Sequence, residues 1–372
     1  MSEERLITVA IHTYEKAIML RTLLESEGID VALQNVNLLQ PVVSSGVRVR
    51  IKERDLPLAL RIIENAEIFT TSTEQRTAKK VAPVLVPTDF SDYSSRAASI
   101  GFEIAHRLKT DVVFLHSYID PYRTGNLQLT DAFSYDPIDD EERKKVETEV
   151  NGLMTDFTNK TKDKIKNGDI PPVKFTSIVA EGIPEETILE YTRTNSTSLI
   201  VMGTRGRGKK EREMIGSVTA EVLDSCRTPA FTVPESATLS SVKNIRNIIF
   251  FSNLEQDDIL ALDSFYRLFP DSAFSVTIVH IPGKKEREET RAKAIDSLLD
   301  YCRKHYTSYV FDVKDVKLQS IVEDFNTISA QQPINLIVVP NKKKNIFARL
   351  FNPSLAHKLL FHADIPMMVI PV

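Results

Sequence analysis

A glycine-rich turn between an apolar run and a helical segment is the part of this sequence best suited to chemistry. Residues 199–202 have the composition of a short buried strand, and Gly203, Gly206 and Gly216 follow, ahead of a helical segment at 217–226. Glycine lets the backbone approach an anion closely, and the N-terminus of a helix presents unpaired N–H groups to it. The turn is therefore predicted to bind the phosphate of a nucleotide.

Two familiar phosphate-binding motifs do not fit this turn. The spacing from Gly203 to Gly208 and Lys209 resembles the start of a Walker A loop, but Lys210 stands where that motif needs a Ser or Thr to hold magnesium. The dinucleotide fingerprint fails as well, because no third glycine follows Gly206 and Gly208 at the required distance. Another kind of phosphate site is indicated.

The spacing Gly-x2-Gly-x9-Gly-Ser, from Gly203 to Ser217, resembles the signature of the universal stress protein family, in the branch that binds adenine nucleotide. Three further segments resemble that family in the right order: 84–91, 112–116 and 228–233. The resemblance covers roughly residues 80–235. The alternative, that the glycines only form a turn before a helix, stays open.

The resemblance implies a role for each part of the site. Pro87 and Asp89 would lie near the ribose and adenine, Ser117 would contact adenine through its backbone, and the glycines would admit the phosphates. Ser117 departs from the small apolar residue common in the family, which leaves the adenine contact least defined. The expected nucleotide-binding residues are Pro87, Thr88, Asp89, Ser117, Met202, Gly203, Arg205, Gly206, Gly216, Ser217, Val218 and Thr219. The expected ligand is ATP or AMP, with or without Mg²⁺.

No catalytic set accompanies this predicted site. His116 ends a strand and recurs as His280, which favours a packing role over catalysis. Neither a second carboxylate nor an arginine finger can be assigned beside Asp89, and no metal ligand is proposed. We therefore expect a nucleotide-responsive stress or signalling protein rather than an enzyme, with weak ATPase activity at most. A slow ATP hydrolase and a ligand-free interaction scaffold remain the alternatives.

Composition excludes several classes of function. The formal charge of −4 over 372 residues argues against a protein that contacts mainly the phosphate backbone of nucleic acid. Cys226 and Cys302 have neither disulfide nor metal-ligand spacing. The sequence lacks an apolar run of about 18 residues and a leader of basic then apolar residues, so no membrane association and a cytoplasmic location are expected.

Spacings repeat along the chain, which predicts two related domains. Asp89 and His116 are 27 residues apart, as are Asn253 and His280; the 26 residues between Gly203 and Pro229 recur between Pro340 and Pro366. In the first copy, strands are predicted at 81–86, 112–117, 174–179, 199–202 and 230–233, alternating with helical segments. This pattern predicts an α/β fold with a parallel sheet and helices on both faces.

The family resemblance implies two tandem Rossmann-type domains of the adenine nucleotide alpha hydrolase-like kind. Their last strands would pair across an intramolecular pseudo-twofold, and a further homodimer stays open. The second copy is predicted to lack the phosphate cradle, because Pro340, Lys343 and Pro353 stand in place of the three glycines. Asn253 likewise replaces Asp89.

The first seventy residues form a separate pattern. Strand-like segments at 6–11, 30–35 and 47–51 and helical segments at 15–26 and 56–66 give the order βαββα. This order and the phrases at 24–29 and 46–49 resemble a small ferredoxin-like α+β domain associated with signal transduction. The predicted division is a domain at 1–70, a polar linker at 71–80, a universal stress domain with the nucleotide site at 81–236 and a degenerate one at 245–372. The protein partner is not defined by these patterns.

Overall fold

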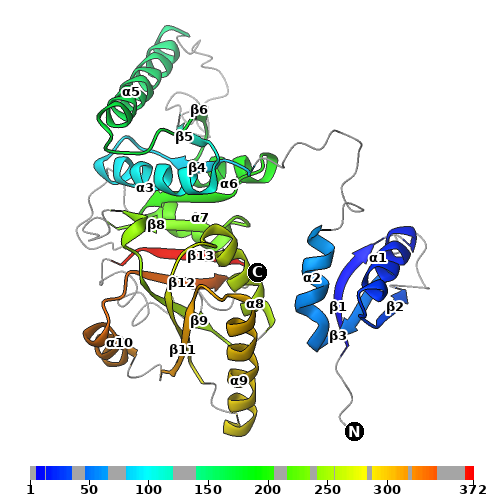
Figure 1. Cartoon of the computed structure of the whole chain (residues 1–372). Coiled ribbons are helices and arrows are strands. Elements are labelled where there is room, and N and C mark those ends of the chain that lie inside the picture. The colour runs from blue at the N-terminus through cyan, green and yellow to red at the C-terminus, as the bar shows by residue number, and fades with distance from the viewer. Residues whose placement is uncertain are drawn as a thin grey trace, which may run out of the picture. The chain divides into compact units, whose positions relative to one another are not determined.

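The computed structural model contains two compact units, Met1–Lys79 and Lys80–Val372 (Figure 1). It describes residues 6–12, 14–35, 47–65, 81–119, 140–204, 216–234, 241–254, 256–282, 287–316, 321–341 and 365–372. The predicted linker at 71–80 lies outside these residues, and so do Arg205, Gly206, Lys343 and Pro353.

The first unit has the element order predicted from the sequence. It consists of β1 (Leu6–His12), α1 (Tyr14–Ser26), β2 (Val31–Asn35), β3 (Val47–Lys52) and α2 (Leu56–Asn65), with a 3-10 turn at Glu53–Asp55. The strands form an antiparallel sheet in the order β1-β3-β2. Val49 and Ile51 alternate along β3 and pack with Leu20 and Leu24 of α1. The ferredoxin-like identity of this unit stays a prediction.

Helix α1 is followed by a glycine that ends it. Gly28 has a φ of +83°, which a residue with a Cβ rarely adopts. The N–H of Ile29 donates to the carbonyl oxygen of Leu24 at 3.0 Å, which satisfies one of the last helical carbonyl groups. This turn directs the chain into β2.

The second unit is built on one ten-stranded sheet. Its strands run in the order β11-β10-β9-β12-β13-β8-β7-β4-β5-β6. The first half contributes β4 (Val84–Pro87), β5 (Val112–Tyr118), β6 (Phe175–Glu181), β7 (Leu199–Gly203) and β8 (Ala230–Val233). The second half contributes β9 (Asn247–Ser252), β10 (Ser275–His280), β11 (Val310–Asp315), β12 (Leu336–Asn341) and β13 (Met367–Pro371). All five strands predicted in the first half are present, with ends shifted by three residues or fewer.

The two halves meet at the centre of this sheet. Within each half the neighbouring strands are parallel, whereas β8 and β13 pair antiparallel, with Phe231 opposite Met368. The hydroxyl of Thr232 also donates to the carbonyl oxygen of Met367 at 3.3 Å. Counted outward from this junction, both halves place their strands in corresponding order. The predicted α/β fold with a mainly parallel sheet is therefore confirmed.

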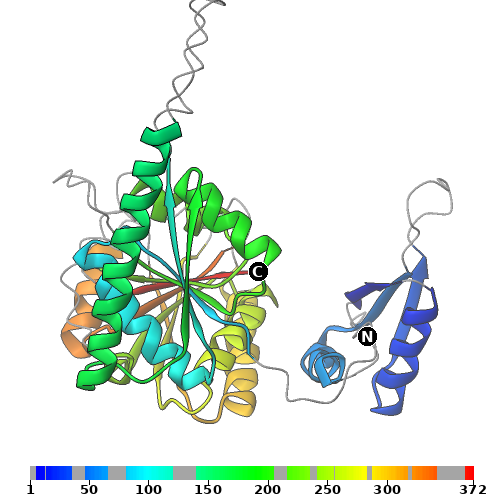
Figure 2. The ribbon, with the colours of Figure 1, turned by 90° about the horizontal axis from the view of Figure 1, so that it is seen from above.

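Helices cover both faces of the sheet (Figures 1 and 2). One apolar core lies beneath α3 (Asp92–Leu108), α5 (Asp140–Asn167), α8 (Gln256–Leu268) and α9 (Glu288–His305). The other lies beneath α6 (Pro184–Thr194), α7 (Ser217–Ser225) and α10 (Ile321–Gln331). Each core includes buried side chains from both halves, so the two halves share their cores. Each fully buried Val or Leu side chain contributes about 1.5–3 kcal/mol.

Helix α3 connects the two halves. Its apolar face is buried at Ala97, Ile100 and Ile104, and Ser91 caps its N-terminus by accepting from the N–H of Ser94 at 3.3 Å. On its other side, Glu103 Oε2 accepts from the hydroxyl of Ser241 at 2.6 Å. The same oxygen accepts from the N–H of Val242 at 2.8 Å, at the start of the 3-10 turn Val242–Asn244. These contacts tie the first half to the segment that leads into β9.

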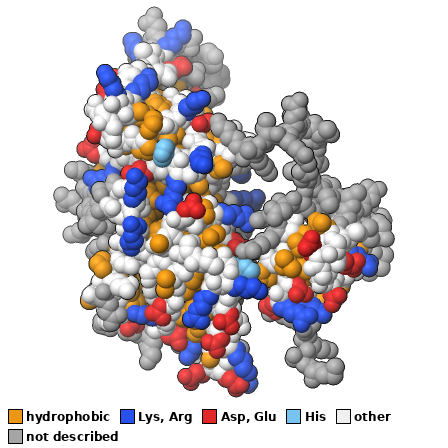
Figure 3. Space-filling view, in the orientation of Figure 1, with side chains coloured by type: hydrophobic (Ala, Val, Ile, Leu, Met, Phe, Trp, Pro, Cys, Tyr) orange, Lys and Arg blue, Asp and Glu red, His pale blue; other side chains and the backbone are white. Residues whose placement is uncertain are grey.

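The outer helices carry a solvated charged surface. Figure 3 shows acidic and basic side chains interspersed over the lower end of the molecule, where Figure 1 places α9. Exposed Glu289 and Lys293 form an ion pair along that helix, with 3.1 Å between carboxylate oxygen and Nζ. Among the residues that the structure describes, no helix is both long enough and apolar enough to cross a membrane.

Candidate functional site

A cavity of about 280 Å³ lies at the carboxyl ends of β4, β5 and β7. From β4 the chain continues to β5 and β6 on one side of β4, and it then returns to β7 on the other side. The strand order therefore reverses between β4 and β7, which makes this a topological switch point. Open α/β sheets bind their ligands at such points. Ten of the predicted residues line the cavity: Pro87, Thr88, Asp89, Ser117, Met202, Gly203, Gly216, Ser217, Val218 and Thr219. Arg205 and Gly206 are outside the described residues.

Thr88 holds the turn at the end of β4. Its N–H donates to the carbonyl oxygen of Leu115 at 2.9 Å, which joins the ends of β4 and β5. Its buried hydroxyl donates to Ser94 Oγ at 3.0 Å and accepts from the N–H of Phe90 at 3.1 Å. Phe90 has a φ of +62°, a left-handed conformation that costs a residue with a Cβ about 1–2 kcal/mol. The Thr88 hydroxyl offsets part of this conformational cost, because it accepts a hydrogen bond from the N–H of Phe90.

Asp89 has a fixed orientation in the wall of the cavity. Its Oδ1 accepts from the N–H of Ser91 at 3.1 Å and from the Ser91 hydroxyl at 2.6 Å. Ser91 is itself the N-cap of α3, so the carboxylate lies beside the positive end of that helix. The arrangement presents a carboxylate of defined position that can accept hydrogen bonds from a ligand hydroxyl.

His116 also lines the cavity. Its Nδ1 lies 2.7 Å from the carbonyl oxygen of Thr88, and since a carbonyl can only accept, Nδ1 carries the proton. The imidazole packs against the Phe90 ring, with 4.2 Å between ring centroids. The contacts are those of the predicted packing role, and they also support the turn that positions Asp89.

The glycine turn closes on the N-terminus of α7. The N–H of Gly216 donates to the carbonyl oxygen of Thr204 at 2.7 Å, and the Thr219 hydroxyl donates to that of Gly203 at 2.9 Å. These two hydrogen bonds join the end of β7 to the start of α7. The first intrahelical bond runs from the N–H of Ala220 to Gly216, so the N–H groups of Ser217 and Val218 precede it and need an acceptor from outside the helix.

Part of the cavity lining is apolar. It is formed by Leu115, Ile188, Met202, Pro184 and Val218, of which the first three are buried. Pro184 and Ile188 belong to α6, and sequence reasoning did not include them because nothing near the glycine motif points to that helix. Five lining residues were missed in total: Ser94, Leu115, His116, Pro184 and Ile188.

The second half repeats the turn but changes its surroundings. Leu254 has a φ of +58°, its N–H donates to Ser252 Oγ at 2.9 Å, and His280 Nδ1 lies 3.0 Å from the Ser252 carbonyl oxygen. These contacts match those of Phe90, Thr88 and His116. Asp258, which replaces Ser94, is fully buried and accepts from the Ser252 hydroxyl at 2.8 Å.

The strand that corresponds to β7 also differs from it. Pro340 stands in place of Gly203, is buried and has no N–H to offer. The next residue, Asn341, is also buried, and its Nδ2 donates to the carbonyl oxygen of Leu223 in α7 at 3.1 Å. This end of β12 therefore supports the helix of the first half. Among the described residues of the whole chain, no group of three or more His, Cys, Asp or Glu side chains could hold a metal ion.

Comparisons with known proteins agree with this fold. Residues 80–234 match the model of the Universal stress protein family. Universal stress protein MJ0577 of Methanocaldococcus jannaschii is 29% identical over 154 residues, which cover 40% of this chain and 93% of that protein. Universal stress protein Rv2623 of Mycobacterium tuberculosis is 29% identical over 157 residues, which cover 42% of this chain and 46% of that protein. The match thus spans less than half the length of the mycobacterial relative.

A solved structure resembles a larger part of the chain. The crystal structure of a universal stress protein from Archaeoglobus fulgidus covers 78% of this chain and 97% of its own, with a TM-score of 0.52 and 13% sequence identity. At that identity the similarity shows the fold alone. The family match covers residues 80–234, which include the glycine motif and every residue that lines the cavity, so this part of the chain is identified as a universal stress protein domain.

Proposed function

We propose that the first half, residues 81–236, binds one adenine nucleotide, ATP or AMP, in this cavity, and that the protein is a nucleotide-responsive stress or signalling protein. The observation that carries the proposal is the meeting of three different surfaces in one cavity: a positioned carboxylate, an apolar wall and a helix N-terminus. A nucleotide has a matching hydroxylated sugar, planar base and phosphate.

Each surface is assigned one part of the ligand. Adenine packs against Met202 and Ile188, because burying its faces there removes apolar surface from water. The ribose hydroxyls donate to Asp89. The phosphates accept from the N–H groups of Ser217 and Val218, where the dipole of α7 favours negative charge. Arg205 and Gly206 stay predicted phosphate contacts, and Mg²⁺ would accompany a triphosphate.

The second half, residues 245–372, is proposed to be a degenerate copy that binds no nucleotide. Pro340 removes a backbone donor, and Asn341 is engaged with the carbonyl oxygen of Leu223. The antiparallel pairing of β8 with β13 makes the two halves an intramolecular pseudo-dimer in this proposal. The unit at 1–70 is proposed to be the signalling domain, joined through the linker at 71–80.

Binding without turnover is favoured over slow hydrolysis of ATP. Of the titratable groups that line the described cavity, the Asp89 carboxylate accepts from Ser91 and the His116 Nδ1–H donates to Thr88. Both groups therefore have structural tasks, and neither is assigned to activate water. ATP that is converted to ADP during long incubation with Mg²⁺, at a rate proportional to protein concentration, would favour the hydrolase instead.

Calorimetric titration of ATP and AMP, each with and without Mg²⁺, tests the proposal. Wild type is expected to bind about one nucleotide per chain, and Gly216→Val with Ser217→Ala to lose that binding. Valine can adopt the φ of −67° and ψ of 149° at Gly216, so the variant should fold. Ser225→Ala, at the other end of α7, is the matched control and should bind as wild type does.

Two outcomes would contradict parts of this proposal. Two nucleotides per chain would show that the second half also binds. Failure of the folded wild type to bind either nucleotide would favour the ligand-free scaffold, in which the glycines serve only the fold.

A further inference from the structure

The two edges of the ten-stranded sheet differ in their chemistry. In the part of the chain that the structure describes, β6 and β11 are its edge strands. Edge strands present unpaired N–H and carbonyl groups to other chains, and charged side chains protect against such pairing. The comparison of β6 with β11 therefore indicates which edge can accept a partner.

Strand β11 is protected by charge. Asp312, Lys314 and Asp315 lie within its six residues. The N–H of Val313, which points away from β10, donates to Asp312 Oδ1 at 2.9 Å. Asp315 also pairs with Arg291 of α9, with 3.1 Å between Oδ2 and Nε. A strand added at this edge would have to displace the Asp312 carboxylate from the Val313 N–H.

Strand β6 has no charged side chain from Phe175 to Ala180, and its first charge is Glu181 at the end. The carbonyl oxygen of Lys174 accepts from Val112, and the N–H of Gly182 donates to Tyr118, so the even-numbered residues bond to β5. In a parallel pair the intervening residues turn their N–H and carbonyl groups outward. Phe175, Ser177, Val179 and Glu181 therefore present the outer edge.

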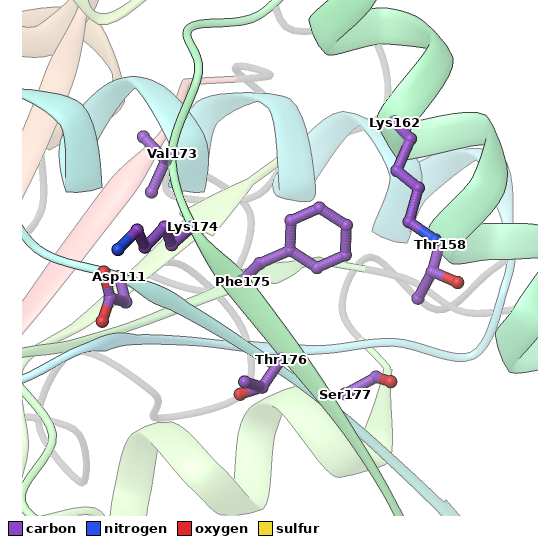
Figure 4. Close-up of a pocket in the computed structure, with 8 residues that line it drawn as sticks. All are labelled: Asp111, Thr158, Lys162, Val173, Lys174, Phe175, Thr176 and Ser177. Carbon is purple, nitrogen blue, oxygen red and sulfur yellow. The ribbon is translucent and has the colours of Figure 1, made fainter.

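A groove of about 600 Å³ runs beside this edge. Figure 4 shows Thr158 and Lys162 extending from α5, and Phe175 and Ser177 on β6. Lys162 is exposed, and its ammonium donates within α5 to Asn159 Oδ1 at 3.4 Å, a long contact. Phe175 and Val179 pack into the core beneath α5, so by alternation Glu181 points to this same face of the sheet.

We propose that β6 pairs antiparallel with β6 of a second copy of this chain, about a twofold axis at Ile178. In this register Ser177 lies opposite the partner's Val179, and Phe175 lies opposite the partner's Glu181. All four residues turn their backbone groups outward, so each opposed pair exchanges two hydrogen bonds. A twofold axis repeats every contact, which makes the interface self-complementary.

Charge complementarity favours a second copy over an unrelated strand. Side chains of directly opposed residues lie on the same face, so the partner's Glu181 enters the groove beside Phe175, where Lys162 lies. The twofold axis brings Glu181 of the first copy to the partner's Lys162 in the same way. The groove's own acidic residue, Asp111, lies beside Lys174 in Figure 4, whereas Lys162 lies at the other end of the groove. Each strand thus supplies an acidic residue beside the other copy's Lys162. This proposal does not depend on nucleotide binding, because the groove is separate from the cavity at β4 and β7.

Sedimentation velocity of the full chain over a range of concentrations tests the interface. Wild type is expected to form a reversible dimer. Ser177→Pro removes only an outward N–H, which edge strands tolerate, and should abolish dimerisation while retaining the folded circular dichroism spectrum. Ser177→Ala keeps that N–H and should dimerise normally. Val313→Pro, the same change at the opposite edge, should also dimerise normally.

Charge reversal tests the register with variants that leave the backbone unchanged. Lys162→Glu and Glu181→Lys are each expected to weaken the dimer about tenfold, since two exposed ion pairs are lost by symmetry. Combining them should restore wild-type affinity. A wild-type monomer at all concentrations, a dimer unaffected by Ser177→Pro, or a double variant no better than the singles would overturn the proposal.

Discussion

Asn341 Nδ2 in β12 donates to the carbonyl oxygen of Leu223 in α7 at 3.1 Å, and it also lies 3.4 Å from that of Asp224. The last carbonyl groups of a helix lack intrahelical partners, so this side chain completes the C-terminal end of α7. The N-terminal end of the same helix lines the cavity. One helix therefore joins the candidate nucleotide site to the second half of the chain.

Asn341→Ala is expected to lower the free energy of unfolding by about 1–3 kcal/mol, because a buried carbonyl group loses its donor. Urea denaturation followed by circular dichroism measures the loss. Asn159→Ala, at an exposed site on α5, is the control and should change stability by less than about 0.5 kcal/mol. Equal stability of the two variants would show that water replaces the Asn341 amide.

Asp89→Asn should weaken nucleotide binding by about tenfold, because a charge-assisted hydrogen bond to the ribose becomes a neutral one. Calorimetric titration with AMP isolates this effect from contacts to the outer phosphates. Asp92→Asn removes an exposed carboxylate three residues further on, in the first turn of α3, and should bind normally. Equal affinity of wild type and Asp89→Asn would contradict the proposal that the ribose hydroxyls donate to Asp89.

Two helical glycines should respond oppositely to alanine. A Cβ at Gly101 in α3 would lie 2.8 Å from Val86 Cγ2, so Gly101→Ala should destabilise the protein by about 1–3 kcal/mol through overpacking. A Cβ at Gly152 in α5 meets no atom within 4 Å, and Gly152→Ala should stabilise by about 0.5–1 kcal/mol. Urea denaturation of both variants tests the close packing of α3 against β4.

Burial raises the pKa of the Cys226 thiol to about 12, and burial likewise raises that of Cys302 to about 12. The reference pKa of both is 9.0, so between about pH 9 and 12 the unfolded thiols release protons that the folded ones retain. Their contribution to stability is therefore complete below pH 9 and declines as the pH rises to 12. Cys302→Val should reduce the slope of unfolding free energy against pH over that interval. An unchanged slope would show that other groups cause the loss of stability at alkaline pH.

The strands of the first half were predictable because they are short runs rich in β-branched and apolar residues, as at residues 199–202 before Gly203. The ten described residues of the predicted site were also brought together, since the carboxyl ends of parallel strands share one edge of the sheet. Pro184 and Ile188 were missed because α6 reaches the cavity only through the position of β6 at the sheet edge. The residues next to Pro184 and Ile188 in the sequence do not indicate that α6 reaches the cavity.

The sequence by itself determined the alternation of strands and helices, the glycine spacing and the loss of those glycines in the second half, because each depends on residues close together in the chain. Only the tertiary structure decided which donors are engaged. Gly216 N–H and the Thr219 hydroxyl bond to carbonyl groups of Thr204 and Gly203, and Asn341 bonds to α7. Hydrogen bonds form between groups that folding brings within about 3 Å, whatever their separation in sequence.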